Sequence, residues 1–60
     1  NVGIDYFKIG EYDIAKSVFQ KEISQNPAED NYYLGEIAYA HGDMNKAKSH
    51  YEAGLAANSD

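Results

Sequence analysis

The stretch GDMNKAKSHYEAGL, from Gly42 to Leu55, decides the fold because an earlier stretch follows the same pattern. From Gly10 to Ile23, 32 residues upstream, the chain reads GEYDIAKSVFQKEI. A glycine, an Ala-Lys-Ser triplet, an aromatic residue and a branched aliphatic residue occupy the same places in both stretches. An ordered match at one fixed period predicts that the chain holds two copies of one supersecondary unit.

The length and charge of the chain exclude several classes of protein. A chain of 60 residues makes at most one small domain and buries only about 60% of the surface exposed on unfolding. The net charge is −5 and there is no arginine, which disfavours contact with a nucleic-acid backbone. No apolar run approaches the roughly 18 residues of a membrane span. We therefore expect neither nucleic acid nor a membrane as the partner.

The start of the chain and its lack of cysteine bear on its origin. Cysteine is absent, so no disulfide is expected, and the sequence does not indicate whether the compartment is oxidising or reducing. The chain opens inside a structured pattern without a methionine, and its N-terminus does not resemble a signal peptide. We expect a piece of a longer, soluble protein, with the cytoplasm favoured as its compartment.

Four helices are expected from the spacing of apolar residues and from signals at helix ends. Gly10 and Gly42 occupy the place of the left-handed glycine that follows a helix. Asn26 and Asp43 are natural N-caps, and Glu29 could complete a capping box with Asn26. The expected helices cover residues 1–9, 11–25, 27–41 and 44–57.

Small and large residues alternate along the predicted inner faces of these helices. The small ones permit close helix approach, and the large apolar ones fill the space around them. The small residues are Gly3, Ala15, Gly35, Ala47 and Gly54. The large residues expected to face inward are Phe19, Ile23, Leu34, Tyr51 and Leu55.

The pattern resembles the tetratricopeptide repeat (TPR), which runs L-G, then Y, A, F or Y, and P. Leu34-Gly35, Ala47 and Tyr51 supply it in the second copy. The first copy has the corresponding residues Val2-Gly3, Gly10, Ala15, Phe19 and Pro27. The resemblance implies a truncated repeat over residues 1–27 and a second repeat over residues 28–60.

The sequence departs from the TPR pattern in three respects. Its period is 32 residues rather than about 34, Ala38 stands where the family has an aromatic residue, and Ser59 replaces the closing proline. A Sel1-like repeat is the nearest competitor, but its period is longer. The resemblance implies an all-α fold of four helices, arranged as antiparallel hairpins stacked in an α-solenoid.

By the same resemblance, the first helix of each hairpin would line a concave groove for a peptide or partner helix. The residues placed there are Ile4, Phe7, Lys8, Glu29, Tyr32, Glu36, Tyr39 and Ala40. Packing against a neighbouring repeat is the competing explanation for these side chains. The groove positions lack the basic residues of a carboxylate clamp, so a neutral or basic segment is expected rather than an acidic C-terminus.

The sequence shows no catalytic set, because its acidic residues are spread over polar helix faces and it has no thiol nucleophile. His41 and His50 lack a metal-ligand spacing, and His50 is expected on the outer side of its helix. The expected function is a non-catalytic protein–protein interaction scaffold without cofactor or metal. The alternatives are a structural spacer, a module that self-associates through open repeat ends, or a docking or regulatory arm of a larger enzyme.

Overall fold

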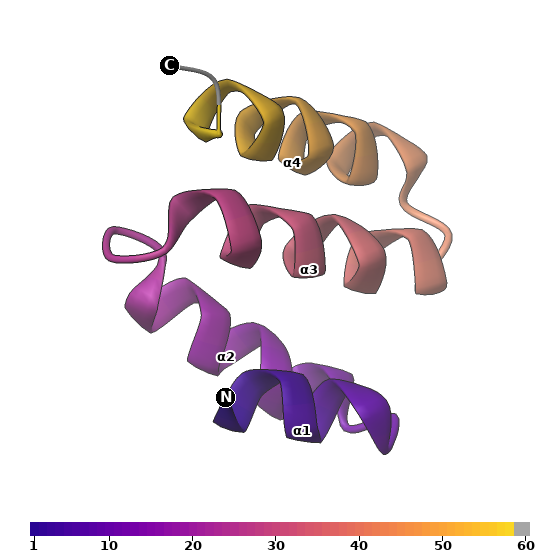
Figure 1. Ribbon diagram of the computed structural model, residues 1–60. Coiled ribbons are helices and arrows are strands. Elements are labelled where there is room, and N and C mark those ends of the chain that lie inside the picture. Colours follow the sequence, from indigo (N-terminus) through magenta and orange to yellow (C-terminus); the bar gives the residue numbers. More distant parts are fainter. Residues whose placement is uncertain (59–60) are drawn as a thin grey trace.

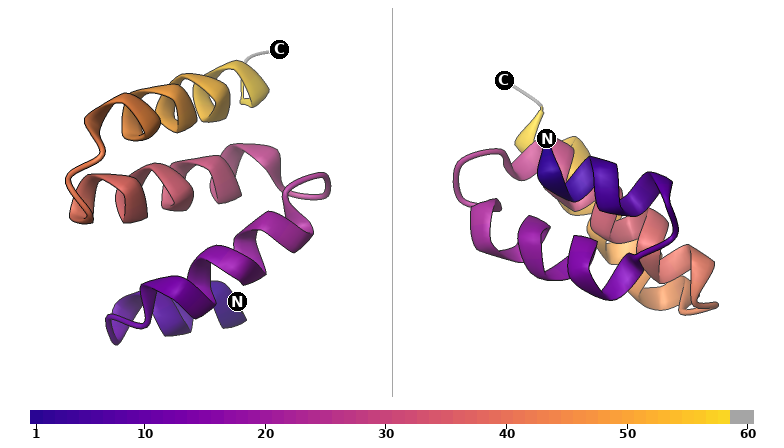
Figure 2. Two further views of the ribbon diagram at one scale, coloured as in Figure 1. Left: turned by 180° about the vertical axis from the view of Figure 1, so that it is seen from behind. Right: turned by 90° about the horizontal axis from the view of Figure 1, so that it is seen from below.

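The computed structural model describes residues 1–58, and all of their regular secondary structure is helical. The four helices are α1 (Val2–Lys8), α2 (Tyr12–Glu22), α3 (Pro27–Ala40) and α4 (Met44–Ala57). The α1–α2 hairpin lies beside the α3–α4 hairpin, with α3 between α2 and α4 (Figure 1). The view from behind shows the same order of helices (Figure 2, left). The prediction of four helices is therefore confirmed, although α2 ends at Glu22, before the expected residue 25.

Two matched glycine turns close α1 and α3. Gly10 and Gly42 have φ angles of 85° and 81°, as predicted for a left-handed residue after a helix. The residue after each glycine donates its N–H to a carbonyl in the preceding helix, from Glu11 to Tyr6 and from Asp43 to Ala38, both at 2.9 Å. These bonds satisfy carbonyl groups that the helix ends would otherwise leave free.

The helix starts differ from one another. Asp43 caps α4 as predicted, because its Oδ1 accepts from the Lys46 N–H at 3.2 Å. The capping box expected at α3 is wrong, since the Asn26 side chain makes no cap hydrogen bond. The Asn26 N–H already donates to the Glu22 carbonyl at 3.1 Å, so it is not free for Glu29.

The core lies where α3 meets the α1–α2 hairpin. Its buried members are Ala15, Phe19, Leu34 and Ile37. The Phe19 ring is fully buried and stacks on Tyr33, with ring centroids 5.1 Å apart and planes 6° apart. A Cβ at Gly3 would lie 2.8 Å from the Phe19 ring, which confirms that the missing side chain permits close approach.

Two predictions for the second hairpin need correction. Leu55 was expected to face inward but is 72% exposed, because α4 packs on α3 through its Ala47 and Gly54 side and leaves Leu55 beyond that contact. His50 was expected on the outer side of α4 but is half-buried. Its Nδ1 lies 3.1 Å from the Asn31 Oδ1 of α3.

Candidate functional site

A hollow of about 590 Å³ lies between the N-terminal half of α3 and the C-terminal half of α4, and we call it the α3–α4 hollow. Its walls are mainly tyrosine rings and small or aliphatic side chains. The residues that line it are Ala28, Glu29, Tyr32, Tyr33, Tyr51, Gly54, Leu55 and Asn58. Its volume and mostly apolar lining fall within the range of ligand pockets, roughly 300–1,000 Å³.

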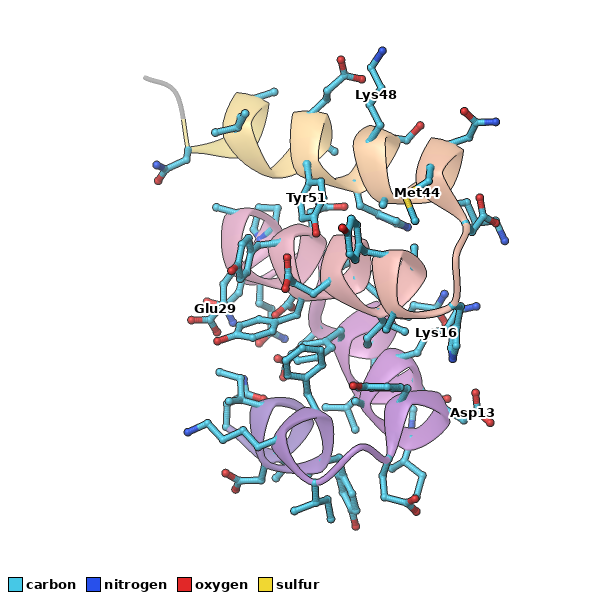
Figure 3. All side chains as sticks on the ribbon, turned by 90° about the vertical axis from the view of Figure 1, so that its right-hand side faces the viewer. Asp13, Lys16, Glu29, Met44, Lys48 and Tyr51 are labelled. Atoms are coloured by element: carbon cyan, nitrogen blue, oxygen red, sulfur yellow. The ribbon has the colours of Figure 1, made fainter. Side chains whose placement is uncertain are left out.

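Two glycines let α3 and α4 approach each other beneath the hollow. A Cβ at Gly54 would lie 3.1 Å from the Ala28 carbonyl oxygen. A Cβ at Gly35 would lie 2.7 Å from the Tyr51 ring. The Tyr51 ring therefore lies across the α3 backbone, and Figure 3 shows it directed from α4 toward α3.

A hydrogen bond fixes the Tyr51 ring. Its hydroxyl donates to Glu36 Oε1 of α3 at 2.5 Å. Burial raises the pKa of Tyr51 to about 12, and the Glu36 carboxylate contributes to the same shift. Tyr51 therefore stays protonated near neutral pH and presents the hollow with a fixed aromatic wall.

Tyr32 forms the exposed edge of this aromatic wall. Its side chain is 50% exposed, with ring centroids 5.2 Å from Tyr33 and 6.1 Å from Tyr51. Leu55, one turn after Tyr51 on α4, also lines the hollow and is still more exposed. A partner that enters the hollow would cover both side chains.

The structure brings only some of the predicted groove residues together. Glu29 and Tyr32 line the α3–α4 hollow, and Glu36 holds its wall through Tyr51. Tyr39 and Ala40 are exposed outside the hollow. The α1 members lie elsewhere: Ile4 and Phe7 are half-buried and pack toward the core, and Lys8 is exposed.

Sequence reasoning missed the contribution of α4 to this surface. Tyr51 and Leu55 were expected to be interior residues because they match Phe19 and Ile23 of the first copy. The same match between the two copies could have indicated that α4 contributes to this surface. A face that is buried in one copy is exposed in the other if no helix covers it.

A buried carboxylate lies at the junction of the two hairpins. Asp30, in the first turn of α3, is fully buried, and both its oxygens lack a hydrogen-bond partner. The pKa of Asp30 is raised to about 6, mainly by burial and in addition by the nearby Glu22 carboxylate. Glu22 itself accepts from Asn1 Nδ2 at 2.8 Å.

A polar contact joins α3 to α4 near this junction. Asn31 Nδ2 donates to the Pro27 carbonyl at 2.9 Å, which leaves Asn31 Oδ1 as the acceptor for the His50 ring. Burial lowers the pKa of His50, and the nearby Lys16 and Lys46 charges lower it further. A neutral imidazole that donates to Asn31 fits this arrangement.

The part of the chain that the structure describes offers no cluster of three or more His, Cys, Asp or Glu residues placed to hold a metal ion. None of the helices in residues 1–58 has the length and apolar character needed to cross a membrane. Comparisons with protein-family models, with curated proteins and with solved structures found no match to this chain.

Proposed function

We propose that this chain is a non-catalytic protein-interaction module that takes an apolar helix or peptide segment in the α3–α4 hollow. The observation that carries the proposal is the hollow itself, an apolar recess with Tyr32 and Leu55 exposed at its edges. Aromatic side chains held in a recess supply large contact areas and are frequent at binding hot spots.

The proposed architecture is two consecutive TPR-like hairpins of an α-solenoid. The 32-residue sequence match supports it, together with the left-handed glycine that ends α1 and α3. Equivalent close contacts support it as well, with Gly3 against Phe19 in one hairpin and Gly35 against Tyr51 in the other. In such arrays each unit buries apolar surface against its neighbour.

The charges around the hollow restrict the kind of segment it would take. Among the residues that the structure describes, Glu29 is the one carboxylic acid in the lining, and no lysine lines it. Glu36 lies close behind, hydrogen-bonded to Tyr51. A segment with aliphatic side chains and a neutral or basic charge fits this surface better than an acidic one, because like charges oppose each other at an interface.

Peptide selection followed by affinity measurement tests the proposal. Random peptides displayed on phage would be selected on the 60-residue chain, and the best would be synthesised with a fluorescent label for polarisation titrations. We expect Tyr32→Ala to weaken binding about tenfold or more, as for a hot-spot residue. Tyr39→Ala is the matched control, because Tyr39 is an exposed tyrosine of α3 that does not line the hollow.

Two outcomes contradict the proposal. One is a failure to select any peptide, and the other is a selected peptide whose affinity depends on Tyr39 and not on Tyr32. Circular dichroism would first show that both variants are as helical as the wild type.

A further inference from the structure

We propose that a small cavity between α2, α3 and the start of α4, which we call the α2–α4 cavity, binds a small oxyanion such as sulfate or inorganic phosphate. Its volume is about 90 Å³, and it shares no lining residue with the α3–α4 hollow. This volume is well below the roughly 300 Å³ of the smallest pockets for organic ligands, so the occupant would be a small ion. Three observations carry the inference: the basic side chains around the cavity, its apolar floor, and the fixed ring of His50.

Basic side chains from two helices meet at this cavity. Lys16 of α2 and Lys46 of α4 both line it and are exposed. The Lys16 side chain lies beside the turn that joins α3 to α4 (Figure 3). His50, one turn after Lys46 on α4, lines the cavity as well. Ammonium and imidazolium groups bind oxyanions through charge-assisted hydrogen bonds.

The charge balance around the cavity favours an anion, although the whole chain carries a net charge of −5. In the part of the chain that the structure describes, the lining holds two lysines and two histidines against one acid, Asp43. That acid is already engaged, because its Oδ1 accepts from the Lys46 N–H at the start of α4. A cation would therefore meet repulsion here, whereas an anion would meet attraction.

The floor of the cavity is apolar. Leu34, Ile37 and Ala38 of α3 form it, and all three are buried. Walls of low polarity strengthen the field of nearby charges, because less water screens them. Burial lowers the pKa of His50, and the Lys16 and Lys46 charges lower it further, so both lysines act on the ring. A bound anion would offset their field.

The His50 ring is held so that one nitrogen remains for a ligand. The Asn31 amide nitrogen donates to the Pro27 carbonyl, so Asn31 Oδ1 is the acceptor that faces His50 Nδ1 at 3.1 Å. Nδ1 therefore carries the proton of the neutral ring, and Nε2 becomes a donor only when the ring is charged. An oxyanion that accepts from Nε2 would favour the charged ring. Binding should consequently take up a proton and raise the pKa of His50.

The direction of the pH dependence follows from the groups around His50. The other titratable or charged groups that line the cavity are Lys16 of α2, His41 at the end of α3, and Asp43 and Lys46 at the start of α4. Lysine and aspartate side chains ordinarily keep their charges between about pH 5 and pH 8, whereas histidine gains a charge as the pH falls. The oxyanion should therefore bind more tightly at about pH 5 than at about pH 8.

Nuclear magnetic resonance titrations of the 60-residue chain with sodium sulfate test the proposal. Sulfate keeps two negative charges over this pH range, so a pH dependence of binding would belong to the protein. The His50 imidazole signals would be followed from about pH 5 to about pH 8, with sodium chloride at equal ionic strength as the reference. Sulfate should raise the pKa of His50 well above its value in chloride.

Substitutions of lysine test which charges form the site. Lys16→Gln and Lys46→Gln should each weaken sulfate binding about two- to fivefold, as expected for one exposed charge pair. In chloride, each should also raise the pKa of His50, because a charge that lowers it has been removed. Lys48→Gln is the matched control and should change neither quantity, since Lys48 is an exposed lysine of α4 that does not line the cavity. Circular dichroism would confirm equal helicity.

A substitution of His50 tests the coupling between binding and protonation. His50→Gln should lose most of the pH dependence of sulfate binding, as followed by the backbone amide signals of α4. Inorganic phosphate and O-phosphoserine would then be compared at neutral pH. Tighter binding of the free ion, which the small volume favours, would assign the site to a free oxyanion. Tighter binding of O-phosphoserine would assign it to a phosphoryl group on a larger molecule.

Two results overturn the inference. One is a pKa of His50 that sulfate raises no more than chloride does, because general ionic screening would then account for the shift. The other is a loss of sulfate binding in Lys48→Gln as large as the losses in Lys16→Gln and Lys46→Gln, because the attraction would then come from the whole surface.

Discussion

The outer faces of α2 and α4 have matching sequences and different surroundings. Phe19 of α2 is fully buried, whereas its counterpart Tyr51 of α4 is only half-buried. Ile23 packs against the core, whereas its counterpart Leu55 is 72% exposed. The difference arises because α3 covers α2 and no helix within residues 1–58 covers α4 in the same way. A repeated pattern determines which side a residue faces, and the neighbouring helix determines whether that side is buried.

The largest expected effect comes from removing the aromatic side chain at each of the two matched positions. Phe19→Ala should destabilise the fold by about 3–5 kcal/mol, the range for a buried phenylalanine. Because so small a domain is only marginally stable, we expect this variant to be largely unfolded at 25 °C. Tyr51→Ala should reduce the stability by only about 1–2 kcal/mol, from a half-covered ring and one hydrogen bond.

Urea titrations followed by circular dichroism would measure both variants at a low protein concentration, where the chain is expected to be monomeric. Phe19→Leu is a control that keeps an apolar side chain at the covered position. Equal losses for Phe19→Ala and Tyr51→Ala would show that the two faces are equally buried in solution, contrary to the structure.

A second experiment concerns the carboxylate at the covered junction, where α3 brings Asp30 close to Glu22. In the second copy Gly54 takes the place of Glu22, so the uncovered face lacks that acid. The pKa of Asp30 is about 6 in the folded chain against 3.8 for an ordinary aspartate. Between these values the folded state binds more protons than the unfolded state, so stability falls as pH rises from about 4 to 6.

Asp30→Asn should remove this pH dependence, because the amide does not ionise. We expect the variant to be more stable than the wild type at pH 7 by up to about 3 kcal/mol, the value of the whole shift, and nearly equal to it at pH 4. Thermal melts at both pH values would measure the difference. Glu22→Gln should show the same trend with a smaller gain in stability. An equal gain for Asp30→Asn at both pH values would contradict the raised pKa of Asp30.

The smallest expected effect is the difference in stability between alanine variants at the two close glycine contacts. Gly3→Ala would press a methyl group on the fully buried Phe19 ring, whereas Gly35→Ala would press on the Tyr51 ring, which is only half-buried. Overpacking of this kind costs about 1–3 kcal/mol, partly offset by the helix preference of alanine, about 1 kcal/mol. Gly3→Ala should lie nearer the upper end of the range.

Thermal melts would rank the two glycine variants against Ser17→Ala, a change at an exposed position of α2 that should leave stability nearly unaltered. A larger loss for Gly35→Ala than for Gly3→Ala would show that Tyr51 is the more tightly held ring.

The sequence allowed prediction of the features that depend on local chain chemistry. The glycine turns at Gly10 and Gly42, the Asp43 cap and the small residues under the aromatic rings all follow from nearby residues, and the structure confirms them. Two residues expected in a groove, Glu29 and Tyr32, line the hollow, and their part in binding stays a prediction.

Features that depend on neighbours in space were not predicted. Apolar spacing predicted that Leu55 faces the interior. Spacing does not tell whether a further helix covers that face. The burial of Asp30 was not predicted, and His50 was placed on the outer side of its helix, because both are buried by contacts between helices. The capping box at Asn26 failed for a similar reason, since the end of α2 had already engaged its N–H.

The two glycine turns have a consequence for the handedness of the residue at each position. A Cβ built on Gly10 or Gly42 would meet nothing within 4 Å, so space does not exclude a larger residue there. Only the positive φ angle does, and that angle is unfavourable for L-amino acids but natural for their mirror images. D-Alanine would fit both turns without strain and would restrict the unfolded chain, which favours folding by about 0.4–1 kcal/mol for each position. The turns require one chirality, and glycine is the single genetically encoded residue that adopts it freely.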